Sequence, residues 1–233
     1  AGRPGRGRAG HHVVIAPAVI GVLVANGTDH RKLVEDPGQL WHVGGGAFRI
    51  GSAFLRRTKV VERSRAAMET LMRDTGETAN LGVEVGDEVL FLAQIETHQA
   101  IRAFFPPGTK GPMHVSGIGK ALMAWYDPAK LSGIISRRGL DRFTDATLTT
   151  ADALAADLAA TRARGFAIDD QEKAMGMRCV AAPIFNAYGE PVAGLSVSGP
   201  AFRIALSDAP RIGALVRAAA DKVTEATGGI RPV

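Results

Sequence analysis

The 233-residue sequence lacks the features that mark secreted and membrane-spanning chains. Its single cysteine, Cys179, can form no internal disulfide, so nothing requires an oxidising compartment. Its longest apolar run, Val13 to Ala25, is interrupted by Pro17 and Gly21 and falls short of the roughly 18 residues that a spanning helix needs. No A-x-A-like cleavage site follows the arginines that precede this run. We therefore predict a cytoplasmic protein that has no membrane partner.

Complete nucleotide-binding and metal-binding motifs are also missing. The fragment from Gly117 to Lys120 resembles the end of a nucleotide P-loop, but the first glycine of that motif is absent at its spacing and Ala121 replaces the Ser or Thr. No internal repeat is visible. We assign no cofactor and no metal site.

The composition is that of an ordinary globular protein with one basic end. Hydrophobic residues make up 46% of the chain and charged residues 22%, which is enough to build a sizeable core. Four of the five net positive charges lie in residues 1–33, where five basic side chains stand against one acid, Asp29. This segment is either a solvated tail or a contact for a polyanion such as DNA. The candidate DNA-binding residues are Arg3, Arg6, Arg8, Arg31 and Lys32.

A β-hairpin is the clearest local signal in the sequence. Two apolar runs, Cys179 to Phe185 and Val192 to Val197, flank Asn186-Ala187-Tyr188-Gly189. Asn at the first position and Gly at the fourth are typical of a type I turn. We therefore predict two antiparallel strands joined by this turn.

The second strand of this hairpin alternates between two kinds of side chain. Its apolar face holds Ala193, Leu195 and Val197, and its small polar face holds Gly194, Ser196 and Ser198. The two hydroxyls lie beside the strand that carries Cys179. Such a cluster either holds a ligand or serves only the fold, because buried Ser and Cys usually have partners within the protein.

Periodicity and turn signals divide the rest of the chain into hairpins and helices. Further strands are predicted at residues 33–34, 40–43, 79–85, 89–95, 100–105 and 166–169. Helices are predicted at residues 52–75, from 114 to about 125, from 127 and from 207 to 227. One more is predicted to open at the capping box Thr149 to Asp152 and to stop at Gly165. Residues 13–24 fit either a strand or a short buried helix. Hairpins interrupted by helices predict an α+β fold with helices packed on an antiparallel sheet.

The helix that opens within His114 to Lys120 is a candidate anion site. The first amides of a helix have no partner inside it, and the helix dipole favours negative charge there. A small carboxylate fits such a place. His114 itself is predicted to be a structural hydrogen-bonding residue ahead of the helix.

Several separated motifs together resemble the IclR family of bacterial transcriptional regulators, over about residues 33 to 229. They are Phe48-Arg49-Ile50-Gly51, Thr75 to Leu81, His114 to Lys120, Gly165 to Asp169, Gly176 to Pro183 and Leu195 to Pro200. They occur in the order that the family has. The sequence around His114 to Gly117 and around Cys179 is most similar to that of the glyoxylate-sensing branch of the family, which includes the allantoin-pathway repressor.

The resemblance implies a ligand-responsive regulator rather than an enzyme. It implies a GAF-like effector domain at residues 76–229, a linker strand and helix at 48–75, and a truncated or divergent winged helix-turn-helix at 1–47. It also implies a homodimer or homotetramer and a small 2-oxo acid effector such as glyoxylate. The implied ligand contacts are Gly117, Ile118, Asp169, Cys179, Ser196 and Ser198.

The N-terminal segment departs from the family pattern. Leu33 to Val43 would be the wing, but residues 1–32 show none of the capped helices that should precede it. We therefore expect DNA affinity to come mainly from phosphate contacts, to depend steeply on salt and to select poorly between sequences.

The alternative function is a cysteine-dependent enzyme acting on a small carboxylic acid. Cys179 would be its nucleophile, His114 the base and Asp169 the orienting carboxylate. A lone cysteine on an apolar strand is usually buried and inert. For Asp169, accepting a hydrogen bond from a ligand and capping the following segment both remain open.

Overall fold

The computed structural model describes residues 33–35, 41–43, 45–47 and 60–232. The chain divides into two units, Ala1–Thr58 and Lys59–Val233. In the first, β1 (Leu33–Glu35) pairs antiparallel with β2 (Trp41–Val43), which confirms the predicted small hairpin. Its turn at residues 36–38, the segment 13–24 and the predicted helix start at Ser52 lie outside the described residues.

The second unit is built on a six-stranded antiparallel sheet of order β5-β4-β3-β8-β7-β6. The strands are β3 (Thr78–Glu84), β4 (Glu88–Ile95), β5 (Lys110–Pro112), β6 (Ala167–Asp170), β7 (Met177–Phe185) and β8 (Pro191–Pro200). Neighbouring strands are antiparallel throughout. The predicted α+β fold is confirmed.

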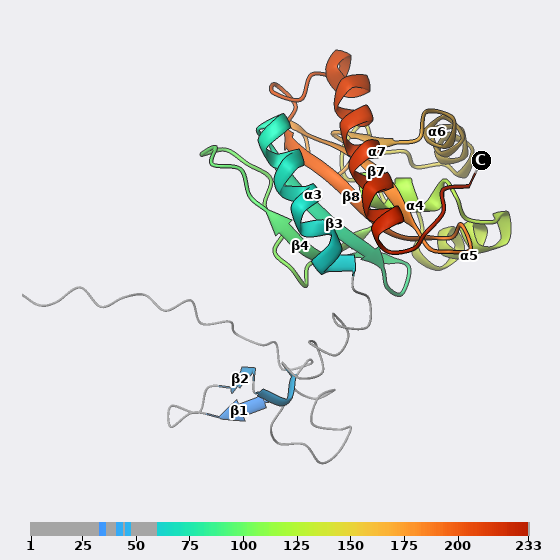
Figure 1. Cartoon of the computed structure of the whole chain (residues 1–233). Helices are drawn as coiled ribbons and strands as arrows, with labels where there is room; N and C mark the ends of the chain where they lie inside the picture. The colour runs from blue at the N-terminus through green and yellow to red at the C-terminus, as the bar shows by residue number, and fades with distance from the viewer. Residues whose placement is uncertain (1–32, 36–40, 44, 48–59, 233) are drawn as a thin grey trace, which may run out of the picture. The chain divides into compact units, whose positions relative to one another are not determined.

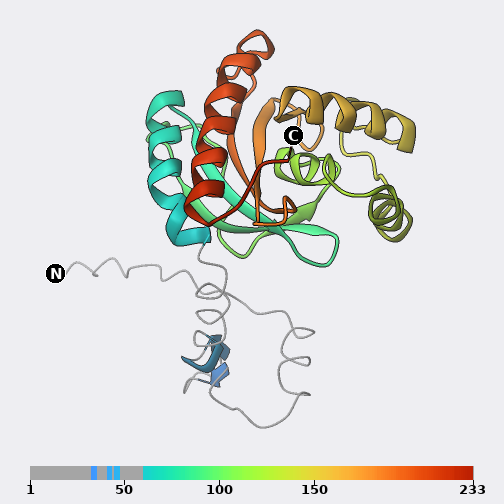
Figure 2. The ribbon, with the colours of Figure 1, turned by 45° about the vertical axis from the view of Figure 1, so that its right-hand side comes forward.

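Helices cover both faces of this sheet. They are α3 (Val60–Thr75), α4 (Gly117–Met123), α5 (Pro128–Arg138), α6 (Ala151–Arg164) and α7 (Ala209–Ala226), which follows the short 3₁₀ turn η1 (Leu206–Asp208). The long helices α3 and α7 lie side by side over one face (Figure 1). On the other face α4 rests on β6, β7 and β8, and α5 and α6 stand beyond it (Figure 2).

Each face of the sheet has its own hydrophobic core. The larger core joins the apolar faces of β3, β7 and β8 to α3 and α7, through residues such as Leu81, Leu195 and Val216. The smaller core joins the opposite face to α4 and α6, through residues such as Ile118 and Leu154. Side chains alternate along the strands, so the same strands serve both cores.

The predicted hairpin is confirmed, with the polarity of its faces as expected. The Gly189 amide donates to the Asn186 carbonyl oxygen at 3.1 Å, and Gly189 has a φ of 74°. The Asn186 side-chain oxygen accepts from the amides of Tyr188 and Glu190, at 2.9 and 3.0 Å. An Asn that bonds the backbone two residues on, and a Gly at positive φ, are what this turn needs.

The ends of α5 and α6 are close to those predicted, with the cap of α6 one residue later than the capping box Thr149 to Asp152 indicates. Thr150 caps α6 by accepting from the Ala153 amide, and Gly165 ends this helix in the left-handed conformation. Asp127 caps α5 by accepting from the Lys130 amide at 2.8 Å. These bonds satisfy amides that a helix leaves unpaired, and they fix where the two helices begin.

The predicted strand at residues 100–105 is wrong. This segment is irregular, with Ile101 and Phe104 exposed to 63% and 61%. The edge of β4 pairs instead with β5, and the chain reaches this edge only after Pro106 and Pro107, which have no amide hydrogen to donate to a ladder.

Candidate functional site

A cavity of about 200 Å³ lies between the start of α4 and the sheet face beneath it. Its wall has an apolar part and a polar part. The apolar part is Phe91, Phe105, Pro112, Val115 and Ile118, together with Gly111 and Gly117. The polar part is Thr109, Lys110, Ser116, Asp169, Lys173, Cys179, Ser196 and Ser198.

All six residues predicted to contact a ligand line this cavity. They are Gly117, Ile118, Asp169, Cys179, Ser196 and Ser198. Strand register explains the sheet side of this group, because residues directly opposite one another share a face. Asp169 pairs with Cys179, and Cys179 pairs with Ser198.

Small residues let α4 lie directly on the sheet. A Cβ at Gly117 would be 2.7 Å from the Cys179 sulfur, and a Cβ at Gly194 would be 2.8 Å from the Ile118 side chain. Ser116 caps the helix and accepts from the Gly119 amide at 3.4 Å. The first amides of α4 are therefore held against the polar face of β7 and β8.

Cys179 and His114 are not arranged as a nucleophile and its base. Burial raises the pKa of the Cys179 thiol to about 11, so the thiolate is scarce at neutral pH. His114 lines a separate cavity with Arg138 and Asp141 under α5. Its Nε2 lies 3.0 Å from the Asp141 carbonyl oxygen, and burial lowers its pKa. The structural role predicted for His114 agrees with this hydrogen bond.

Asp169 both lines the cavity and caps the segment that follows it. One carboxylate oxygen accepts from the Glu172 amide at 2.8 Å. Burial, together with the charge of Glu172, raises the pKa of Asp169 to about 7. At neutral pH the group is present both as an acid, which can donate a hydrogen bond, and as a carboxylate.

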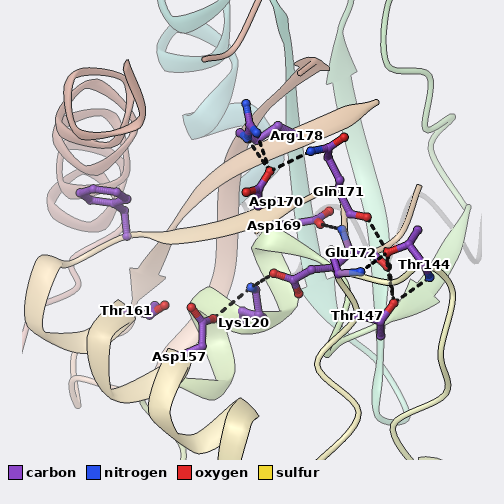
Figure 3. Close-up of polar contacts among 12 residues, drawn as sticks. Lys120, Thr144, Thr147, Asp157, Thr161, Asp169, Asp170, Gln171, Glu172 and Arg178 are labelled. Carbon is purple, nitrogen blue, oxygen red and sulfur yellow. Dashed lines mark hydrogen bonds and ion pairs between the residues drawn. The ribbon is translucent and has the colours of Figure 1, made fainter. Parts of the chain in front are cut away.

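Behind Asp169, a buried ionic cluster ties the loop after β6 to two helices (Figure 3). The fully buried Lys120 ammonium on α4 lies 2.5 Å from Glu172 and 3.0 Å from Asp157 on α6. The Thr147 hydroxyl donates to the Glu172 carbonyl oxygen at 2.7 Å, and the Thr144 hydroxyl donates to that of Gln171 at 2.8 Å. One side of the cavity is thereby fixed in place.

Sequence reasoning missed the cations and the aromatic residues of the cavity wall. Lys110 lies on β5, and the Lys173 ammonium lies 3.4 Å from the centre of the Phe143 ring. Desolvation lowers the pKa of Lys173. Phe91 and Phe105 stack with ring centres 4.8 Å apart. No short pattern marks these residues, because the cavity collects them from separate segments.

It also missed Asn80, which lies behind the two serines. The Asn80 amide nitrogen is 3.4 Å from the Ser196 hydroxyl oxygen and 3.3 Å from that of Ser198. The alternation in Thr78-Ala79-Asn80-Leu81 could have identified Asn80, because it puts two polar side chains on one face of a strand.

The other predicted site residues lie elsewhere. Arg3, Arg6, Arg8, Arg31 and Lys32 fall outside the described residues. In the part of the chain that the structure describes, no helix is long and apolar enough to cross a membrane. Within that same part, no cluster of His, Cys, Asp and Glu side chains is suited to a metal ion.

Comparison with known proteins identifies the family. Residues 52–225 match the family described as "Bacterial transcriptional regulator IclR C-terminal". The chain is 51% identical to the HTH-type transcriptional regulator BhcR of Paracoccus denitrificans, over 90% of this chain and 77% of that protein. It is 38% identical to the transcriptional repressor IclR of Escherichia coli, over 88% of this chain and 80% of that protein.

Solved structures agree with the sequence match. The crystal structure of the Thermotoga maritima IclR superposes with a TM-score of 0.75 and 26% identity, covering 91% of this chain and 84% of that one. The relatives are transcriptional regulators and not enzymes. The cysteine-dependent enzyme is therefore set aside, and the chain belongs to the IclR family of bacterial transcriptional regulators.

Proposed function

We propose that this chain is a ligand-responsive, DNA-binding transcriptional regulator whose cavity senses a small 2-oxo acid such as glyoxylate. The observation that carries the proposal is the set of residues that line one cavity: Gly117 and Ile118 at the start of α4, the serines Ser196 and Ser198, and the cations Lys110 and Lys173. Hydrogen-bond donors and cations from several elements suit a carboxylate.

The size of the cavity favours a small effector. Drug-sized ligands occupy pockets of roughly 300–1,000 Å³. The cavity here is about 200 Å³, and the stacked pair Phe91 and Phe105 supplies an apolar wall. A two- or three-carbon acid would place its carboxylate at the donors and its remaining atoms at this wall.

Regulation follows from different affinities of the effector for two states of the protein. An effector shifts the balance between DNA-binding and released states only by binding one of them more tightly. We propose that residues 1–47 form the winged-helix segment with β1 and β2 as its wing, that 48–75 is the linker and that 76–229 is a GAF-like effector domain. The proposed assembly is a homodimer or homotetramer in the cytoplasm.

A thermal-shift titration with glyoxylate and pyruvate tests the effector. A ligand at about 100 times its Kd stabilises the folded state by about 2.7 kcal/mol, which raises the Tm of a chain of this size by roughly 5–10 °C. We expect such a shift for the unmodified protein and none for Ser196→Ala/Ser198→Ala.

The matched control is Ser132→Ala/Ser136→Ala, which removes two exposed hydroxyls from α5, outside the cavity. It should keep the full shift. A shift of equal size in the Ser196/Ser198 variant would put the effector elsewhere. No shift with either acid in the unmodified protein would remove the assignment to a 2-oxo acid.

A further inference from the structure

A line of polar side chains crosses the cavity face of the sheet, from β4 to the two serines on β8. Gln94 on β4 pairs in register with Asn80 on β3, and Asn80 pairs with Ser196 on β8. Residues paired in this way share a face, so all three side chains lie on the cavity side of the sheet. Asn80 is fully buried and Gln94 is half-buried.

The hydrogen bonds along this line run in one direction. The Gln94 amide nitrogen donates to the Asn80 side-chain oxygen at 2.9 Å. The Asn80 amide nitrogen donates to Ser196 and Ser198, at 3.4 and 3.3 Å. A side-chain amide has one acceptor end and one donor end with two hydrogens, so a bond to its oxygen aims the nitrogen at the serines.

Each serine oxygen uses one lone pair to accept a hydrogen bond from Asn80. The hydroxyl hydrogen of each serine therefore points away from Asn80. A hydroxyl has one hydrogen to donate and two lone pairs that accept. Ser196 and Ser198 are 1% and 3% exposed and both line the cavity, where Cys179 is the neighbouring side chain. A thiol sulfur is a weak acceptor, so an anion in the cavity is the better partner for both hydrogens.

We propose that Asn80 is the positioning residue that makes Ser196 and Ser198 hydrogen-bond donors, and so sets the preference of the site for a carboxylate over a neutral ligand. This inference rests on the proposed function. Asn80 is absent from the cavity wall and acts through the serines. If its amide were turned round, the serines would donate to Asn80 and present lone pairs to the cavity, which would repel a carboxylate.

The test compares the Kd of glyoxylate with the Kd of its neutral amide, glyoxylamide, by titration calorimetry on the full chain. Asn80→Leu keeps the volume and removes both N–H donors. We expect it to weaken glyoxylate binding by about tenfold and to change glyoxylamide binding by less than about twofold, because hydrogen bonds to charged groups are the stronger ones.

Gln94→Glu tests the direction of the line without changing a buried residue or the cavity wall. The new carboxylate accepts from the Asn80 amide nitrogen and so turns that amide. The serines then donate to the Asn80 oxygen and present only lone pairs to the cavity. Glyoxylate binding should fall by tenfold or more while glyoxylamide binding holds or improves. Gln99→Glu adds the same charge on an exposed loop beyond β4 and should preserve the preference.

The outcomes separate this inference from the proposed function. A loss of glyoxylate binding caused only by the added charge would shrink in about 0.5 M salt, because salt screens charges. A loss caused by turning the Asn80 amide should persist in Gln94→Glu at that salt concentration. The inference is overturned if Asn80→Leu and Gln94→Glu change both Kd values by the same factor. If Asn80→Leu does not fold, Gln94→Glu decides alone. If the unmodified protein binds neither compound, the proposed function fails and the inference fails with it.

Discussion

At the scale of single residues, the surroundings of Asp169 strongly alter its chemistry. This residue is 8% exposed, caps the Glu172 amide and lines the cavity. Its pKa of about 7 lies well above the usual value of 3.8 because burial penalises the charge and Glu172 repels it. A proposed anionic effector would add to this repulsion. Binding should therefore take up protons at Asp169 and strengthen as the pH falls through 7.

The same shift makes the free energy of unfolding depend on Asp169. Between about pH 4 and 7 the folded chain holds a proton that the unfolded chain has lost. The resulting stabilisation is complete below pH 3.8 and is lost as the pH rises through 7. Asp169→Asn has no such loss and keeps an oxygen to accept from Glu172. We expect it to be about 2–4 kcal/mol more stable than the unmodified protein at pH 8, and about equal at pH 4.

Urea unfolding from pH 4 to 8 measures this difference. Asp145→Asn is the control, because Asp145 is an exposed loop carboxylate. Its unfolding curve should follow that of the unmodified protein at every pH. A difference for Asp169→Asn that does not vary with pH would refute the role given to its titration.

At the scale of elements, the Lys120 cluster joins α4, α6 and the loop after β6. Removing one member of a buried ion pair leaves the other charge uncompensated, which costs about 3–5 kcal/mol. We expect Lys120→Met to be destabilised by about this amount. Lys120→Met/Glu172→Leu also removes the more buried of the two carboxylates that Lys120 contacts, while Asp157 keeps Arg164 at 3.6 Å, so it should recover most of the loss. Urea unfolding of the single and double variants measures both values.

A double variant as unstable as the sum of the single variants would show that the two side chains contribute independently. The result matters for the site, because Glu172 also supplies the amide that Asp169 caps. Loosening the cluster should therefore change the environment of Asp169 as well as the stability of the fold.

Local signals explain why most elements were predictable. Turn and cap residues such as Asn186, Thr150 and Gly165 act within a few residues of their own position. The polar face of β8 could be assigned from alternation alone. The strand at residues 100–105 was mispredicted because its apolar content gave no information about which segment takes the edge of β4.

The deeper parts of the site depend on contacts between distant segments. Asn80 meets Ser196 across 116 residues, and Lys120 meets Glu172 across 52. No spacing rule connects such positions. The six predicted ligand contacts followed from a family resemblance, whereas Asn80, Lys110 and Lys173 emerged only from the structure.

At the scale of the whole molecule, charge is distributed unevenly along the chain. Residues 1–33 carry four of the five net positive charges, whereas the proposed effector site lies in the unit Lys59–Val233. We expect replacement of Arg3, Arg6, Arg8, Arg31 and Lys32 by Gln to weaken DNA binding and to flatten its salt dependence. Each lost phosphate contact lowers the slope of log K against log salt by about 0.9.

Mobility-shift titrations at several salt concentrations measure this slope, and thermal shift with glyoxylate provides the control. Effector binding should be unchanged in the Gln variant. DNA binding with an unaltered slope would place the DNA-contacting surface in another part of the chain.

The shared use of β8 also bears on how effector preference can evolve. Ser196 and Ser198 line the cavity, while Leu195 and Val197 pack in the core that includes α3 and α7. A substitution at Ser196 or Ser198 that suits another effector also displaces the core side chains of Leu195 and Val197, which are the adjacent residues of the strand. Lineages that change effector should therefore carry compensating substitutions on α3 and α7, at positions that never touch the ligand.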